Sequence, residues 1–202
     1  FYDQQIAAMG ITNEQSGMLL SIYSIVNMVT LIPGGILADK FSVKKCLVYS
    51  ILGSVAAIVI YALTMNFIVA CFVWALVGVS TIFVFWCAIT KAVGMVGSEE
   101  TQGTCYGIYY AASGIVSAVL NAVCLWASRF SDDPAQSFII AMWVMAAWTL
   151  LAAVLVILFF KEKDIAPGNP DDRFQFKYVG DVLKNPMTWL LSIMVMCAYG
   201  LY

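Results

Sequence analysis

Long apolar stretches recur along the whole chain and are separated by short polar segments. Five of them are long enough to cross a bilayer, because a helical span needs roughly 20 mostly apolar residues. They cover residues 17–38, 46–65, 67–90, 104–127 and 137–160, and a sixth begins after Pro186. None of the five contains an internal Asp, Glu, Lys or Arg, whereas a surface helix of a soluble protein shows a charged face. The pattern predicts an all-α membrane protein with five complete transmembrane helices and a truncated sixth.

The composition agrees with this pattern and excludes several kinds of site. Apolar residues make up 62% of the 202 positions and charged residues 11%, against roughly 45–50% and about 25% in soluble domains. A net charge of −2 provides no basic surface for nucleic acid. The chain has no histidine, and its six cysteines form no CxxC pair. We therefore expect no catalytic site, no metal site and no cofactor, with the cysteines acting as small packing residues.

The basic residues fall almost entirely on one side of the predicted membrane helices. Nine of the ten lie in connections on that side: Lys40, Lys44, Lys45, Lys91, Lys161, Lys163, Arg173, Lys177 and Lys184. Only Arg129 lies on the other side. Because Lys and Arg in short loops mark the cytoplasmic face, we assign the nine to the cytoplasm.

The longest connection covers residues 161–185 and contains Pro167, Gly168, Asn169 and Pro170 near its start. It predicts a cytoplasmic linker between a transmembrane bundle at 1–160 and the start of a second bundle at 186–202. Its later part, 178–183, suits either a short amphipathic helix at the membrane surface or a disordered tether.

The sharpest local signal lies between the first two spans, where Asp39 stands at the mouth of an apolar helix. Lys40, Lys44 and Lys45 follow it within six residues. A membrane anchor explains the lysines but not the acid. A carboxylate at that place can pair with Lys40 or with the positive end of a neighbouring helix. Such contacts can form in one conformation and break in another, which is how a switch is biased.

Gly35, Asp39, Lys40, Lys44 and Lys45 match, in order and spacing, the signature Gly-x-x-x-Asp-Arg/Lys-x-Gly-x-Arg/Lys-Arg/Lys. This signature belongs to the major facilitator superfamily of transporters, which the chain therefore resembles. Ser42 stands where the signature has Gly. The resemblance implies that Asp39 latches the cytoplasmic sides of two helical bundles together. It also implies that the three lysines hold the loop to its partner helices.

The resemblance extends to the topology of the whole chain. Members of that superfamily have twelve spans in two six-helix bundles joined by a long cytoplasmic linker, and the signature follows the second helix. The first span seen here would then be helix two. We therefore expect a partial bundle of this type, running from the end of helix one to the start of helix seven.

Polar side chains form a stripe along two of the predicted spans. In residues 104–127 they recur every three or four positions and share one face of a helix: Tyr106, Tyr110, Ser113, Ser117 and Asn121. A weaker stripe in residues 17–38 includes Tyr23 and Asn27, and Trp86 lies near the end of the third span. These residues either line a transport pathway or hold helices together by hydrogen bonds, and the sequence leaves both readings open.

Further features bear on the kind of transporter. The span 67–90 has no Arg and the span 104–127 has no Pro, which sets the chain apart from many proton-coupled members and from drug–proton antiporters. Residues 99–103, together with Gly107, resemble the organophosphate and organic-anion branch.

The function predicted is secondary active transport of a small polar solute by alternating access, in a bacterial inner membrane. An organic anion is one candidate solute and a coupling ion a candidate partner, in addition to the lipid bilayer. The alternatives are a membrane-embedded enzyme and a non-transporting receptor or scaffold.

Overall fold

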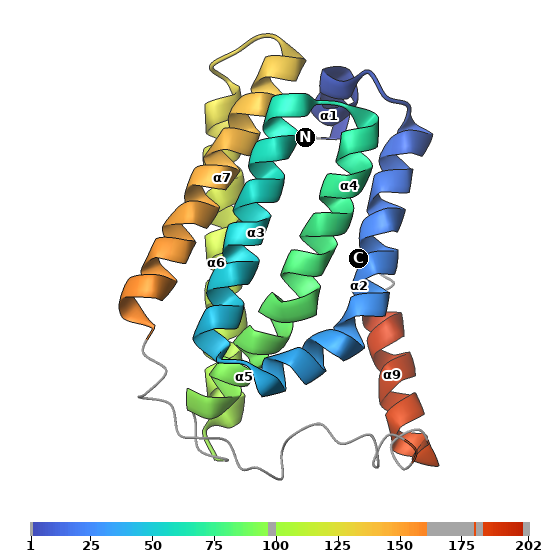
Figure 1. Cartoon of the computed structure of the whole chain (residues 1–202), viewed down its shortest axis with the longest axis vertical. Helices are drawn as coiled ribbons and strands as arrows, with labels where there is room; N and C mark the ends of the chain where they lie inside the picture. Colours follow the sequence, from blue (N-terminus) through green and yellow to red (C-terminus); the bar gives the residue numbers. More distant parts are fainter. Residues whose placement is uncertain (1, 97–99, 161–179, 181–183, 200–202) are drawn as a thin grey trace. The chain divides into compact units, whose positions relative to one another are not determined.

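The computed structural model describes residues 2–96, 100–160, 180 and 184–199 (Figure 1). The chain divides into two compact units, Phe1–Gly168 and Asn169–Tyr202. The described residues are helical and include no strand, which confirms the predicted all-α class. The amphipathic helix or tether predicted within 178–183 lies outside the described residues, Gly180 excepted.

Eight helical segments make up the described part of the first unit: α1 (Tyr2–Met9), α2 (Asn13–Lys40), α3 (Val43–Thr64), α4 (Phe67–Gly78), the π-helix η1 (Val79–Trp86), α5 (Cys87–Val96), α6 (Gln102–Ser128) and α7 (Pro134–Phe159). The second unit contains α9 (Pro186–Tyr199), at the place of the predicted sixth span.

The helices follow the predicted spans, with two differences. Three of them, α3, α6 and α7, are long and apolar enough to cross a membrane, and a shorter apolar helix covers Phe67–Thr81. The third predicted span is divided into α4, η1 and α5 instead of forming one regular helix. The other difference is α1, an eight-residue helix where the sequence analysis expected only the end of a span.

Local signals explain how α1 stops and α2 starts. Gly10 has a φ of +62° directly after α1, and the Ile11 N–H donates to the Ile6 carbonyl, which is the Schellman arrangement that favours glycine. Two residues later, Thr12 and Gln15 bond to each other's backbone N–H groups at 3.2 and 3.0 Å. This capping box satisfies two otherwise unpaired donors at the start of α2.

Side-chain caps also mark the turns at either end of α3. Ser42, the residue that replaces Gly in the family signature, has a φ of −60° and accepts a hydrogen bond from the Lys45 N–H. The turn therefore needs no left-handed residue, and the hydroxyl caps α3. At the far end Asn66 caps α4, accepting from Ile68 and Val69.

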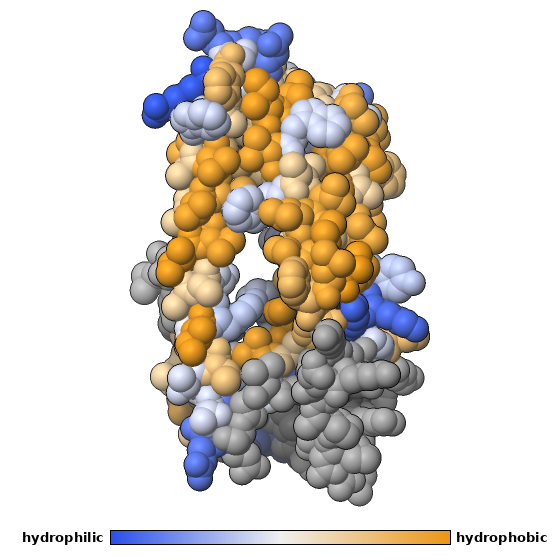
Figure 2. All heavy atoms as spheres, turned by 90° about the vertical axis from the view of Figure 1, so that its left-hand side faces the viewer, coloured by the Kyte–Doolittle hydropathy of each residue, from blue (hydrophilic) through white to orange (hydrophobic). Residues whose placement is uncertain are grey.

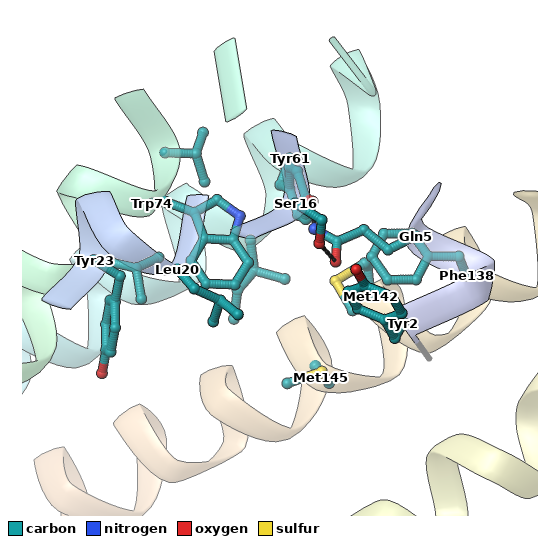
Figure 3. Close-up of a pocket in the computed structure, with 13 residues that line it drawn as sticks. Tyr2, Gln5, Ser16, Leu20, Tyr23, Tyr61, Trp74, Phe138, Met142 and Met145 are labelled. Carbon is teal, nitrogen blue, oxygen red and sulfur yellow. Dashed lines mark hydrogen bonds between the residues drawn. The ribbon is translucent and has the colours of Figure 1, made fainter. Parts of the chain in front are cut away.

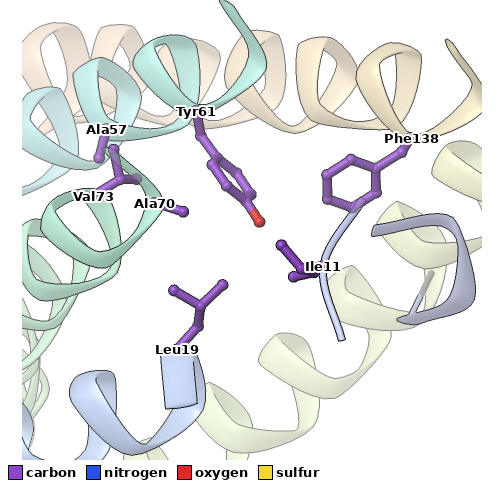
Figure 4. Packing of buried hydrophobic residues seen from close by; sticks show 7 residues of the cluster. All are labelled: Ile11, Leu19, Ala57, Tyr61, Ala70, Val73 and Phe138. Carbon is purple, nitrogen blue, oxygen red and sulfur yellow. The ribbon is translucent and has the colours of Figure 1, made fainter. Parts of the chain in front are cut away.

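Two hydrophobic clusters hold the first unit together, one toward each end. The first joins α2, α3, α4 and α7 with the segment after α1 (Figure 4): Ile11, Leu19, Ala57, Tyr61, Ala70, Val73 and Phe138. The second joins the start of α3 to α5: Val43, Cys46, Leu47, Ala88 and Ala92, with Val156 and Phe160 packed against it. Along their length α3 and α7 make the most extensive helix pair in the unit.

We call the end that carries Lys44, Lys45 and Lys91 the basic end, and the end that carries α1, Asn66 and Arg129 the opposite end (Figure 1). Between them lies a broad hydrophobic surface, shown for one face in Figure 2. Large apolar side chains on α7, including Leu151, Leu155 and Leu158, are about half exposed or more. So much exposed apolar area is expected of a protein whose solvent is lipid.

Candidate functional site

The candidate switch motif spans the end of α2 and the start of α3. Asp39 and Lys40 form the last residues of α2, and their side chains are outside what the structure describes. Gly35 lies one turn earlier, and a Cβ added to it would contact nothing within 4 Å. Close packing therefore does not explain this glycine.

The two adjacent lysines of the motif have different surroundings. The Lys44 Nζ donates a hydrogen bond to the Ile157 carbonyl oxygen at 2.8 Å. That carbonyl belongs to the last turn of α7, where backbone acceptors have no partner within the helix. Lys45 is exposed, and in the described part of the chain its ammonium group has no partner. Lys44 thus joins the motif to α7, whereas Lys45 does not.

Two polar residues of α2, Tyr23 and Asn27, face the third span. The Tyr23 and Thr81 hydroxyl oxygens lie 3.4 Å apart, and the Tyr23 ring meets Trp74 edge to face with centroids at 6.2 Å. The Asn27 Oδ1 is buried without a hydrogen-bond partner among the described residues, and a Cβ on Gly78 would lie 3.2 Å from it. In this structure Tyr23 and Asn27 therefore serve the contact between α2 and the third span.

The predicted stripe on α6 divides into two parts. The Tyr106 hydroxyl donates to the Thr90 carbonyl oxygen of α5 at 2.9 Å, so this residue holds two helices together. The other four members, Tyr110, Ser113, Ser117 and Asn121, are exposed, and no hydrogen-bond partner for their side chains is found in the described part of the chain. The neighbouring glycines of α6 are also open, since a Cβ on Gly107 or Gly114 would contact nothing within 4 Å. Trp86, in η1, is 40% exposed.

A cavity of about 440 Å³ lies near the opposite end of the first unit (Figure 3). It is lined by residues of α1, α2, α3, α4 and α7, among them Gln5, Ser16, Tyr23, Tyr61, Trp74 and Phe138. None of the described residues that line it is charged. Apart from Tyr23, the sequence analysis named none of these residues.

A buried polar network closes one side of this cavity. The Gln5 Nε2 donates to the Tyr61 hydroxyl oxygen at 2.7 Å, and the Ser16 hydroxyl donates to the Gln5 Oε1 at 3.5 Å. The Tyr61 ring meets Phe138 edge to face with centroids at 5.9 Å. The network connects α1, α2 and α3, so it fixes α1 over the cavity. Gln5, one of two adjacent glutamines near the start of the sequence, does not reveal such a contact by its local pattern.

Within the residues that the structure covers, no group of three or more His, Cys, Asp or Glu side chains could hold a metal ion. None of the five cysteines whose side chains it describes forms a disulfide: Cys46, Cys71, Cys87, Cys105 and Cys124. The exposed polar groups of the α6 stripe are hydroxyls and an amide, which donate and accept hydrogen bonds.

The comparisons with known proteins agree with the fold and the motif. The family model "Major Facilitator Superfamily" matches residues 4–202. The chain therefore belongs to the major facilitator superfamily, a family of membrane transporters, and is part of an integral membrane protein. This confirms the resemblance found in the switch motif and favours transport over enzymatic activity.

Three curated relatives match nearly the whole chain. It is 27% identical to "Uncharacterized protein MG294 homolog" of Mycoplasma pneumoniae, over 95% of the chain and 45% of the relative. It is 25% identical to "Inner membrane protein YihN" and 23% identical to "Inner membrane protein YqcE", both of Escherichia coli K12. Those matches cover 95% and 96% of the chain and 47% of each relative. The chain thus spans a little under half the length of these relatives, and no solved structure matches it significantly.

Proposed function

We propose that this chain is part of a secondary active transporter that moves a small polar solute by alternating access. The observation that carries the proposal is the exposed face of α6 with Tyr110, Ser113, Ser117 and Asn121. A polar group facing hydrocarbon costs free energy unless it finds a hydrogen-bond partner. Polar side chains in membrane helices therefore face a water-filled path or another protein segment, and membership of a transporter family favours the path.

The proposal includes an orientation and a division of the chain. The basic end would face the cytoplasm, because it carries Lys44, Lys45 and Lys91 while Arg129 lies at the opposite end. Residues 1–160 would form one transmembrane bundle. Residues 161–185 would be the cytoplasmic linker, and residues 186–202 would begin the second bundle. Two relatives are named inner membrane proteins, which supports a bacterial inner membrane as the location.

The solute is proposed as a small polar molecule, with an organic anion as the candidate that follows from the resemblance of residues 99–103. The exposed groups of α6 suit the hydroxyl, carbonyl or anionic oxygen atoms of such a solute, because they donate and accept hydrogen bonds. A coupling ion would supply the driving force.

Uptake by the full-length protein in proteoliposomes tests the function. A panel of neutral polyols, organic phosphates and carboxylates is offered with and without proton and sodium gradients. Gradient-driven accumulation of one class, absent from protein-free vesicles, is the expected result. Absence of flux for every class, from protein shown to be folded, would contradict the transporter proposal.

A further inference from the structure

The third span contains an unusual segment at its centre. Residues 79–86 form the π-helix η1 between α4 and α5. Helices with i→i+5 hydrogen bonds are rare, mostly a single turn long, and frequent at functional sites. One extra residue in a turn shifts the two flanking helices by roughly 100° about the axis relative to a regular helix. An eight-residue π-helix inside a membrane span therefore needs support from its surroundings.

That support is visible as close approaches between the third span and its two neighbouring helices. A Cβ added to Gly53 of α3 would lie 2.7 Å from the Ser80 Oγ of η1. A Cβ added to Gly78, the last residue of α4, would lie 3.0 Å from the Val26 Cγ1 of α2. Glycine on α3 thus makes room for η1, and glycine on the third span, directly before η1, makes room for α2.

The two flanks of η1 are packed into different clusters. Ala70 and Val73 of α4 belong to the first hydrophobic cluster, at the opposite end. Ala88 and Ala92 of α5 belong to the second, at the basic end. Among the η1 residues whose side chains the structure describes, 79–81, 85 and 86, only Phe85 packs against one of the two clusters, the second. The segment therefore joins two anchored ends.

The neighbouring helix α2 has its own weak point close to this segment. Pro33 lies inside α2, where it removes one backbone hydrogen bond and bends the helix. The Sγ of Cys87, the first residue of α5 directly after η1, lies 3.9 Å from the Leu31 carbonyl oxygen, two residues before Pro33. Figure 1 shows that α2 and the third span both turn toward the same side on their way to the basic end.

We propose that η1 and Pro33 form one paired hinge, at which α2 and the third span bend together between the opposite end and the basic end. The two helices run parallel. They contact each other through Tyr23 and Thr81 on one side of the bend. They also contact each other through Leu31 and Cys87, next to the bend. A bend in one therefore requires a bend in the other. The hinge connects the rigid part around the cavity to the residues that carry the switch motif.

Hydrogen–deuterium exchange on the protein in lipid nanodiscs tests the hinge. Amides of residues 79–86 should exchange about tenfold faster than those of α4 and α5, because their hydrogen bonds open locally. Equal protection along all three segments would overturn the proposal. This measurement needs no solute. A negative result for the hinge is therefore distinguishable from a negative result for the proposed transport function. Only the role of the hinge in transport rests on that proposed function.

A proline variant tests the pairing. Pro33→Ala restores a backbone donor in α2 and should slow exchange in residues 79–86 several-fold, although it lies on another helix. Pro134→Ala is the matched control, because Pro134 occupies the first turn of α7, where its missing N–H costs nothing. The pairing is overturned if Pro33→Ala alters exchange only within α2, or if Pro134→Ala has the same effect on residues 79–86.

Discussion

The Lys44 Nζ and the Ile157 carbonyl oxygen lie 2.8 Å apart, 113 positions apart in the chain. The contact places a cation at the carboxyl end of α7, where the helix dipole is negative. It also ties the switch motif to the last turn before residue 160. The contact therefore connects the α2–α3 turn to the end of α7.

Replacement of Lys44 by Met should lower stability, whereas the same change at Lys45 should not. A cation at a helix carboxyl terminus contributes about 0.3–1 kcal/mol, equivalent to a fall of a few °C in the melting temperature of a domain of this size. Thermal unfolding of the purified protein in detergent measures it. Lys44→Arg should keep most of the stability. An equal response of the two lysines to Met would show that the contact is not stabilising.

The buried pair Gln5 and Tyr61 should show strong coupling in stability. Tyr61→Phe leaves the Gln5 Nε2 without the partner it has at 2.7 Å, and an unsatisfied buried donor costs about 1–3 kcal/mol. The double variant Gln5→Leu/Tyr61→Phe should therefore be less destabilised than the sum of the single changes. Tyr49→Phe is the control, because Tyr49 is on the same helix and 72% exposed. Additive effects would mean that the network does not fix α1.

Gly53 should tolerate no branched side chain. In Gly53→Val the new carbons meet Ser80, whose Oγ would lie 2.7 Å from the Cβ. Overpacking of this kind typically costs about 1–3 kcal/mol. Gly17→Val is the control, since nothing lies within 4 Å of a Cβ there. Gly53→Val/Ser80→Ala should recover part of the loss. If the melting temperature of Gly53→Val equals that of Gly17→Val, α3 and η1 are not in close contact.

These sites differ in how far the sequence predicted them. The spans were visible because lipid removes the need for charged faces, so runs of about 20 apolar residues stand out. The switch motif was visible because its spacing is fixed by a helix end and a turn. Signals for the start of α2 were also present, in Gly10 and in the Thr12–Gln15 capping box, but they set where a helix begins and not what it packs against.

The remaining features depend on tertiary contacts that no local pattern encodes. Gln5 looks like any polar residue near a helix end until Tyr61, 56 positions away, is placed beside it. The division of the third span into α4, η1 and α5 leaves its apolar pattern unchanged, because every residue of 67–90 is neutral and most are apolar. Tyr106 and Tyr110 are equivalent in the periodic stripe, and only the position of Thr90 separates them.

Asp39→Asn tests the latch that the family signature implies. The change keeps the size of the side chain and removes its charge, so insertion into the membrane should be unaffected. The carboxylate's interaction with a positive helix end or a lysine is weakened, which should shift the balance between inward-open and outward-open states and slow transport. Uptake in proteoliposomes, with the accessibility of a single cysteine on each side, reports both effects. Wild-type flux and accessibility would remove the latch role.

The two tyrosines of α6 provide the sharpest test of the transport pathway. Tyr106→Phe removes a hydrogen bond between α5 and α6. It should therefore lower the free energy of unfolding by about 0.5–1.5 kcal/mol, and with it the melting temperature. The apparent affinity for the solute should stay the same. Tyr110 has an exposed hydroxyl with no partner in the described part of the chain, so Tyr110→Phe should leave stability unchanged and weaken the apparent affinity.

Asn121→Ala should behave like Tyr110→Phe, because both side chains lie on the exposed part of the stripe. Cys124→Ala, one turn further along α6 and buried, is the control for a change that alters packing alone. Concentration-dependent uptake separates affinity from maximal rate, and thermal unfolding of the same samples separates both from stability. If Tyr110→Phe and Asn121→Ala leave the affinity unchanged, the exposed stripe contacts protein instead of solute. The pathway must then be sought elsewhere in the bundle.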